Sequence, residues 1–83
     1  PDDLTRIEGI GPKIKSALAD AGITTFSQLA SAKMDDLRAI LAKTKMSGYN
    51  DPGTWPEQAA LAAAGKWEEL DKLQDELKGG KRV

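Results

Sequence analysis

The chain has 83 residues, with 12 lysines and arginines against 13 aspartates and glutamates, a net charge of −1, and neither histidine nor cysteine. The missing histidine and cysteine exclude Ser-His-Asp and Cys-His catalytic pairs, disulfide frameworks, and cysteine-type zinc or iron–sulfur sites. The charge balance argues against a protein that coats nucleic acid with a broadly basic surface, so any nucleic-acid contact must be local.

A chain of this length is expected to form one domain over residues 1–83, whose apolar core holds the fold without a disulfide or a metal. The longest apolar run, 59–64, is far shorter than the roughly 20 residues of a membrane-spanning helix. No secretory signal opens the sequence. We therefore expect a cytoplasmic monomer with no membrane partner.

The first part of the chain, residues 2–22, indicates two helices separated by a sharp break. A short helix is expected over 2–8, with an aspartate at its start as the cap. The Gly-Ile-Gly segment 9–11 interrupts it. A second helix begins at Pro12, where the missing N–H of proline costs no hydrogen bond, and ends before Gly22.

The middle of the chain continues this helical pattern. A connector helix is expected in the segment 25–33, opened by a capping box between Thr25 and Gln28. The next helix covers about 34–42, where apolar residues recur on one face. The glycine- and proline-containing stretch that follows, 43–53, is typical of a loop.

Two further helices are expected before the C-terminus. A second capping box, between Thr54 and Glu57, opens an alanine-rich helix that ends near Gly65. The last helix, 66–79, is followed by a tail at 80–83. Its predicted buried face contains Trp67, Leu70, Leu73 and Leu77.

No segment alternates with a period of two, so the predicted fold class is all-α. A short repeat also divides the chain: residues 2–7 match 35–40 at two aspartates, a leucine and an isoleucine. In both copies an interruption follows, and then a proline-started, alanine-rich helix that ends at glycine. The pattern indicates two copies of one helix–hairpin–helix unit, over 2–22 and, in degenerate form, over 34–65.

The residues around the first hairpin suggest an anion site. Two glycines flanking one apolar residue favour a tight turn in which Ile10 fills the gap between the helices. The amides of Gly9, Gly11 and the first turn after Pro12 then point outward at the positive end of a helix, an arrangement suited to phosphate. Lys13 adds a charge beside it. Lys15 and Arg6 are close in sequence.

The stretch from Leu4 to Lys13, with apolar Leu4 and Ile7, Gly-Ile-Gly at 9–11 and then Pro-Lys, resembles the helix-hairpin-helix motif. The resemblance is close over 3–22 and extends over about 2–65 as a tandem domain. It implies a small SAM-like helical bundle with an added C-terminal helix. The later part also resembles domains appended to larger bacterial proteins, such as a ribosomal protein or a respiratory-chain subunit.

The family resemblance implies non-sequence-specific binding to a nucleic-acid phosphate, with DNA as the first expectation and RNA as the alternative. The donors would be the amides of Gly9, Gly11 and Ile14, with the Lys13 side chain nearby, and Ile10 and Lys15 complete the predicted nucleic-acid-binding site. Some members also hold K⁺ or Na⁺ with hairpin carbonyls. No cofactor is required, but a monovalent cation is a candidate ligand here. The matching carbonyls are those of Thr5, Ile7 and Ile10.

Two positions depart from the family pattern. Lys15 stands where a small residue is usual, and either loosens the helix contact or adds a charge. The second hairpin has no Gly-apolar-Gly, because a long loop between Ala42 and Thr54 replaces it. The chain would therefore present one hairpin, and weak binding is expected.

Alternative interpretations remain for the same residues. The hairpin is also compatible with a packing role in a protein-interaction or assembly module, docked onto a parent protein or complex. The loop residues Lys43, Lys45 and Tyr49 fit either a second phosphate contact or a plain surface loop. Trp67 is expected in the core, and Trp55 over a helix entrance. The acidic pairs have neither metal-ligand spacing nor an acid/base partner, so no enzymatic activity is expected.

Overall fold

The computed structural model describes residues 2–44, 51–78 and 81–82. Its helical elements in chain order are the 3-10 turn η1 (Leu4–Arg6), the helices α1 (Pro12–Asp20), α2 (Phe26–Ala30) and α3 (Met34–Lys43), the 3-10 turn η2 (Pro52–Thr54), and the helices α4 (Trp55–Ala63) and α5 (Trp67–Asp75). Two-residue strands β1 (Leu77–Lys78) and β2 (Lys81–Arg82) follow and pair antiparallel. The predicted all-α class is confirmed, with this short pair as the one β contact among the described residues.

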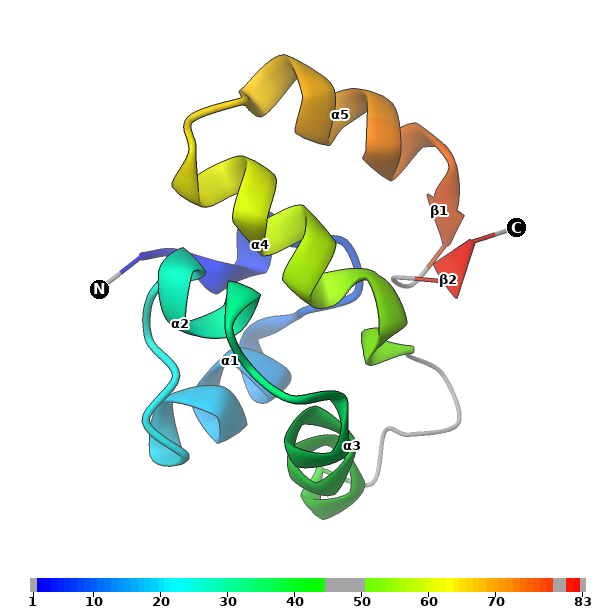
Figure 1. Cartoon of the computed structure of the whole chain (residues 1–83). Helices are drawn as coiled ribbons and strands as arrows, with labels where there is room; N and C mark the ends of the chain where they lie inside the picture. Colours follow the sequence, from blue (N-terminus) through cyan, green and yellow to red (C-terminus); the bar gives the residue numbers. More distant parts are fainter. Residues whose placement is uncertain (1, 45–50, 79–80, 83) are drawn as a thin grey trace.

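The bundle is arranged around α4. This helix packs against α2 on one side and α5 on the other, while α1 packs against α3 (Figure 1). The molecule measures 32 × 28 × 20 Å along its principal axes. None of the described helices is long and apolar enough to cross a bilayer.

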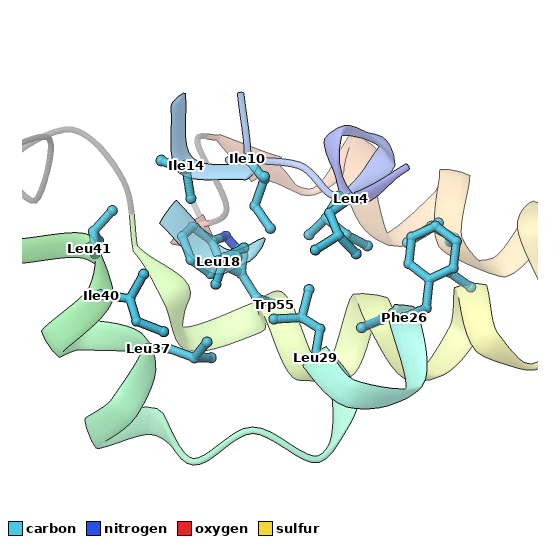
Figure 2. Close-up of a cluster of buried hydrophobic side chains, with 14 residues drawn as sticks. Leu4, Ile10, Ile14, Leu18, Phe26, Leu29, Leu37, Ile40, Leu41 and Trp55 are labelled. Carbon is cyan, nitrogen blue, oxygen red and sulfur yellow. The ribbon is translucent and has the colours of Figure 1, made fainter. Parts of the chain in front are cut away.

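Side chains from both halves of the chain form one continuous core. Figure 2 shows Trp55 in the middle of this cluster, with Leu18, Leu29 and Leu37 around it. Trp55 has no exposed surface. Because a buried tryptophan contributes a large apolar area, this side chain is a main anchor between α4 and the first three helices.

The two alanine-rich helices end in the same way. In α1 and α4 a glycine with positive φ, 88° at Gly22 and 73° at Gly65, follows the last turn. Each glycine N–H donates to the carbonyl three residues earlier, and the next N–H donates to the carbonyl five residues earlier, at 2.9 to 3.0 Å. This is the Schellman arrangement, which glycine favours because it has no Cβ. The shared geometry supports the predicted internal repeat.

Local predictions near the N-terminus are partly confirmed. The capping box of Thr25 and Gln28 forms as expected. The predicted helix over 2–8 is wrong in extent, because only the 3-10 turn Leu4–Arg6 forms, capped by the carboxylate of Asp3. The turn is short because Ile7 already has extended backbone angles, which direct the chain into the hairpin.

The second predicted capping box is wrong. Thr54 has helical rather than extended backbone angles and makes no side-chain capping bond, because it lies in the turn η2. Its hydroxyl oxygen instead accepts a hydrogen bond from Nε2 of Gln58 at 3.2 Å. The Thr54 hydroxyl, which the sequence pattern assigned to helix capping, therefore makes its hydrogen bond inside the core.

The C-terminal helix is shorter than predicted. α5 ends at Asp75 rather than at 79, and Leu77 belongs to β1. Leu77 is nevertheless buried, and β2 lies against η2. The chain thus turns back towards η2. A longer α5 would have carried it away from the bundle.

The prediction for Trp67 is wrong, whereas Trp55, expected over a helix entrance, is the first residue of α4. Trp55 is in the core, whereas Trp67 is 39% exposed, the most exposed large apolar side chain among the described residues. Leu70 and Leu73 dock α5 onto the bundle, and Trp67 lies beyond them in the first turn. Of the loop residues singled out above, Lys43 is instead the last residue of α3, and Lys45 and Tyr49 lie outside the described part of the chain.

Candidate nucleic-acid interface

The hairpin between η1 and α1 is a tight turn built on Gly9. Gly9 has a φ of 101°, which an L side chain rarely adopts. The turn is closed by a hydrogen bond of 3.1 Å from the Ile10 amide to the Ile7 carbonyl. Ile10 is 4% exposed and points into the core beside Ile14 and Leu4 (Figure 2). The predicted plug between the two elements is therefore present.

Gly11 has a different character from Gly9. Its φ of −97° and ψ of −177° are open to any residue, and a Cβ placed on it would meet no atom within 4 Å. Neither the turn nor internal packing thus requires a glycine here. The space over Gly11 opens outward at the start of α1, where a small residue permits close approach from outside.

Several amides at the start of α1 are available. The first bond of the helix runs from the Lys15 amide to the Gly11 carbonyl at 2.9 Å. Within the described part of the chain, the amides of Gly11, Lys13 and Ile14 donate no hydrogen bond. Two of the three predicted phosphate donors, Gly11 and Ile14, are in this group. The third, Gly9, already takes part in an interaction inside the protein.

The positive charges near the hairpin are mostly engaged. Lys15, a predicted contact residue, forms an ion pair with Asp3 at 3.2 Å. The Arg6 guanidinium lies over the Trp67 ring, 4.8 Å from its centroid. Lys13 is exposed and has no ion-pair partner among the described residues. One lysine is therefore directly available beside the amides.

The ion pair at Asp3 belongs to a small network on η1. The Thr5 hydroxyl and the Lys15 ammonium both donate to the Asp3 carboxylate, as does the Thr5 amide. These donors, the hydroxyl first, lower the pKa of Asp3 from 3.8 to about 2. A carboxylate therefore stands beside Lys15 at neutral pH, and it opposes an incoming phosphate.

The carbonyls predicted to hold a monovalent cation lie on the same segment. The Ile7 carbonyl accepts the Ile10 amide, which leaves one lone pair for another donor or ion. Thr5 lies on the exposed surface of η1, and Ile10 directly precedes the N-cap of α1. A K⁺ or Na⁺ at Thr5, Ile7 and Ile10 remains a prediction.

A residue that the sequence reasoning missed holds the hairpin in place. Gln58 in α4 has no exposed surface, and its Oε1 accepts the Glu8 amide at 2.7 Å while its Nε2 donates to the Glu8 carbonyl at 3.1 Å. Nε2 of Gln74 in α5 donates to Gln58 Oε1 at 3.0 Å and to the Arg6 carbonyl at 2.6 Å. The signal available in the sequence was a polar residue on the face that also carries Trp55 and Ala62.

The hairpin backbone is thus fastened to α4 and α5 by two amide side chains. Such bonds fix the turn whether or not a ligand is present, since they pair the part-buried N–H and C=O of Glu8. The result is a fixed turn followed by three amides that donate no hydrogen bond within the described residues, with one available lysine and one nearby carboxylate. It is suited to a single phosphate contact and also to packing against another protein.

Comparison with known proteins places this architecture in a family. The model of the helix-hairpin-helix domain shared by RS2, RL21 and YNQ2 proteins matches residues 4–63. The chain belongs to this family. The family predicted from the residues around the hairpin is therefore confirmed, and α5 lies beyond the matched region.

Relatives carry the domain as part of longer proteins. The small ribosomal subunit protein uS2 of Methylobacterium radiotolerans is 42% identical over 71% of this chain and 17% of its own length. The large ribosomal subunit protein bL21 of Hyphomonas neptunium is 41% identical over 75% of the chain and 30% of its own length. An uncharacterized 22.9 kDa protein in the nqo2 3′ region of Paracoccus denitrificans is 43% identical over 77% and 30%.

The chain thus spans less than a third of the length of these relatives. The two with assigned names are ribosomal proteins rather than enzymes. No solved structure matches the chain significantly. The comparisons identify a helical domain that larger proteins carry.

Proposed function

We propose that this chain is an assembly domain of a larger protein. It docks that protein onto a large macromolecular complex such as a ribosomal subunit. The observation that carries the proposal is the recurrence of the same domain in uS2 and bL21, named for different ribosomal subunits, as 17% and 30% of their lengths. A unit attached to different hosts is suited to a docking role that does not depend on the rest of the host.

The geometry of the hairpin supports docking over strong nucleic-acid binding. Lys15 and Arg6 are engaged with Asp3 and Trp67, and the chain has a net charge of −1. Strong non-specific binding needs several phosphates neutralised by lysine or arginine. One hairpin with one available lysine can neutralise few phosphates.

An NMR titration of the isotope-labelled chain with purified small and large ribosomal subunits tests the proposal. Association with a particle of that size broadens the amide signals of the whole domain, and an excess of unlabelled chain should restore them. Short duplex DNA and RNA at the same concentration should not cause this broadening. Unchanged line widths with both ribosomal subunits would refute the proposal.

A second candidate, phosphate binding by the hairpin, is favoured by one specific observation. The amides of Gly11 and Ile14 donate no hydrogen bond within the described residues, and Lys13 lies beside them. DNA and RNA fit equally, because backbone amides contact phosphate and not base edges. We expect Kd values in the non-specific range, roughly 10⁻⁴ to 10⁻⁶ M or weaker.

The two candidates are separated by titration with short duplexes at two salt concentrations. Phosphate binding predicts salt-sensitive shifts confined to the amides of Gly11 and Ile14 and their neighbours. Lys13→Glu should remove them, whereas Lys33→Glu, an equal charge change at the start of α3, should not. Shifts that survive Lys13→Glu, or that spread evenly over the surface, would contradict a hairpin site.

A further inference from the structure

The exposed side of α5 is a second surface with its own chemistry. Leu70 and Leu73 face inward, and the other positions of the helix from Trp67 to Asp75, apart from half-buried Gln74, are exposed. Residues four apart lie along one row of a helix, so Trp67, Asp71 and Asp75 form an outward stripe. Figure 1 shows α5 at the edge of the bundle, with α4 as its neighbouring helix.

Trp67 begins this stripe with an accessible aromatic surface. Its ring meets Phe26 edge to face at a centroid distance of 5.8 Å, and the Arg6 guanidinium lies 4.8 Å from the ring centroid. A shallow depression beside the ring is lined by Gly65, Lys66, Trp67, Glu68 and Glu69. The protein's own arginine on this ring shows that the site accepts a guanidinium, through the attraction between a cation and an aromatic face.

The charge of the helix is strongly unbalanced. Seven charged residues lie between 66 and 76, and all of them are exposed. Two are lysines and five are carboxylates, and one of the lysines, Lys66, has its ammonium 3.9 Å from Glu69. The carboxylates are Glu68, Glu69, Asp71, Asp75 and Glu76. This segment therefore carries a net charge of −3, in a chain whose total is −1.

We infer that the Trp67–Asp71–Asp75 stripe docks a basic peptide segment of a partner protein. A lysine or arginine of the partner contacts the exposed part of the Trp67 ring, and neighbouring basic residues face the carboxylates of Asp71 and Asp75. Charge complementarity favours this occupant over a nucleic acid, whose phosphates these carboxylates repel. The inference rests on the proposed assembly function and specifies the chemistry of the partner.

The position of α5 in the family agrees with this role. The match to the family model ends at residue 63, and α5 begins at Trp67. The shared part contains the hairpin, most of the core and Gln58. The docking stripe lies in a segment outside the family model, where partner preference can differ between carriers of the same fold.

Titration with a deca-arginine peptide, monitored by NMR and tryptophan fluorescence, tests the inference. We expect salt-sensitive shifts at the Trp67 indole and at amides 67–76, with the indole of buried Trp55 unchanged. The double variant Asp71→Asn with Asp75→Asn should weaken binding about fivefold, since two exposed ion pairs are lost.

A matched control removes the same two charges elsewhere. Asp20→Asn with Asp36→Asn changes one exposed carboxylate on each of α1 and α3 and should alter the affinity less than about twofold, because only the general attraction changes. Equal weakening by the two double variants would overturn the inference, as would an unshifted Trp67 indole at saturating peptide. Stronger shifts at 67–76 with a ten-nucleotide RNA than with the peptide would overturn it too.

The same variants distinguish failure of this inference from failure of the proposed function. If ribosomal subunits broaden the signals of the wild type and of the Asp71/Asp75 double variant equally, the stripe is not the docking surface, and the assembly function stands. If the wild type shows no broadening, the assembly function itself fails. Trp67→Ser, with Trp55 emission as a check of folding, should weaken deca-arginine binding as well.

Discussion

Gln58 is the residue on which the hairpin geometry depends. It meets both the N–H and the C=O of Glu8, a pairing that requires a side chain able to donate and accept at once. Leucine at position 58 would offer neither a donor nor an acceptor. Glutamate at this position would place a carboxylate oxygen where the Glu8 carbonyl needs a donor. The interaction joins residues 50 positions apart and links the first unit of the repeat to the second.

Replacing Gln58 with alanine should therefore lower the free energy of unfolding by about 1–3 kcal/mol, because the part-buried N–H and C=O of Glu8 lose their partners and the fully buried Gln58 side chain is removed. Urea denaturation measures the change. Gln28→Ala provides the control, since Gln28 caps α2 at the exposed surface and should cost less. Equal losses in the two variants would show that the bonds from Gln58 to Glu8 add nothing to the stability.

Asp3 offers a prediction that depends on pH. Its pKa is lowered from 3.8 to about 2, first by the Thr5 hydroxyl and then by Lys15. Because the folded-state pKa is the lower one, the carboxylate stabilises the fold above its ordinary pKa, and this stabilisation is lost as the pH falls from about 4 towards about 2. The free energy of unfolding of the Asp3→Asn variant should lack this pH-dependent stabilisation.

Carbon-detected NMR titration of the Asp3 carboxyl group checks the causes separately. Thr5→Val should raise the pKa of Asp3 more than Lys15→Met does, since the hydroxyl is the larger cause. The reverse order would mean that the ion pair, and not the hydroxyl, controls the titration of Asp3.

Among the elements, the hairpin combines two glycines with different physical roles. Gly9 adopts a positive φ of 101°, which only glycine adopts readily. Gly11 adopts ordinary extended angles with open space around it. The two positions of the Gly-Ile-Gly motif therefore respond differently to the same substitution.

Gly9→Ala should lower the free energy of unfolding by about 1–2 kcal/mol, because a Cβ is strained at positive φ. Gly11→Ala should leave it unchanged or raise it by up to about 1 kcal/mol, since the unfolded chain loses freedom and the fold loses nothing. Thermal and urea unfolding of the two variants measure this. A destabilised Gly11→Ala would mean that the motif needs both glycines for folding.

The Gly11→Ala variant also separates an effect on folding from an effect on binding. If the hairpin contacts phosphate, the added methyl group of Gly11→Ala covers the amides at the start of α1 and should weaken the duplex-induced shifts in a chain of full stability. Unchanged shifts in a folded Gly11→Ala variant would argue against a close approach at this point.

For the whole molecule, the decisive outcome is the placement of its two tryptophans. Trp55 is at the centre of the core and Trp67 is on the surface beside Arg6. Collisional quenching by acrylamide or iodide should therefore act on the emission of Trp67 and hardly on that of Trp55. A Trp67→Phe variant, which retains Trp55 alone, should show blue-shifted emission that resists quenching until the chain unfolds. Easily quenched emission from that folded variant would contradict the packing of α4.

Most of the helical pattern could be predicted because it depends on local chemistry. Pro12 at a first helical position, Gly22 and Gly65 after the last turns, and the Thr25–Gln28 capping box act within a few residues of themselves. The hairpin residues Gly9 and Ile10 were identified on the same basis. The candidate donors remain a prediction, since their ligand lies outside the chain.

The errors came from contacts between distant segments. Thr54 fits a capping box, but Gln58 and the turn η2 draw it inward. Trp67 fits the apolar face of an amphipathic helix, but where that face meets the bundle depends on how α5 docks on α4. The pairing of Lys15 with Asp3 likewise links two segments whose separation a sequence pattern does not define.

The sequence by itself determined the helix class, the first hairpin and the family, because turn glycines, prolines and periodic apolar residues act locally. The tertiary structure alone decided which charges near the hairpin are engaged, which tryptophan is buried, and that Gln58 and Gln74 fasten the hairpin. These outcomes depend on distances between residues up to 68 positions apart, which only the packed chain defines. The surfaces left for a partner are consequences of that packing.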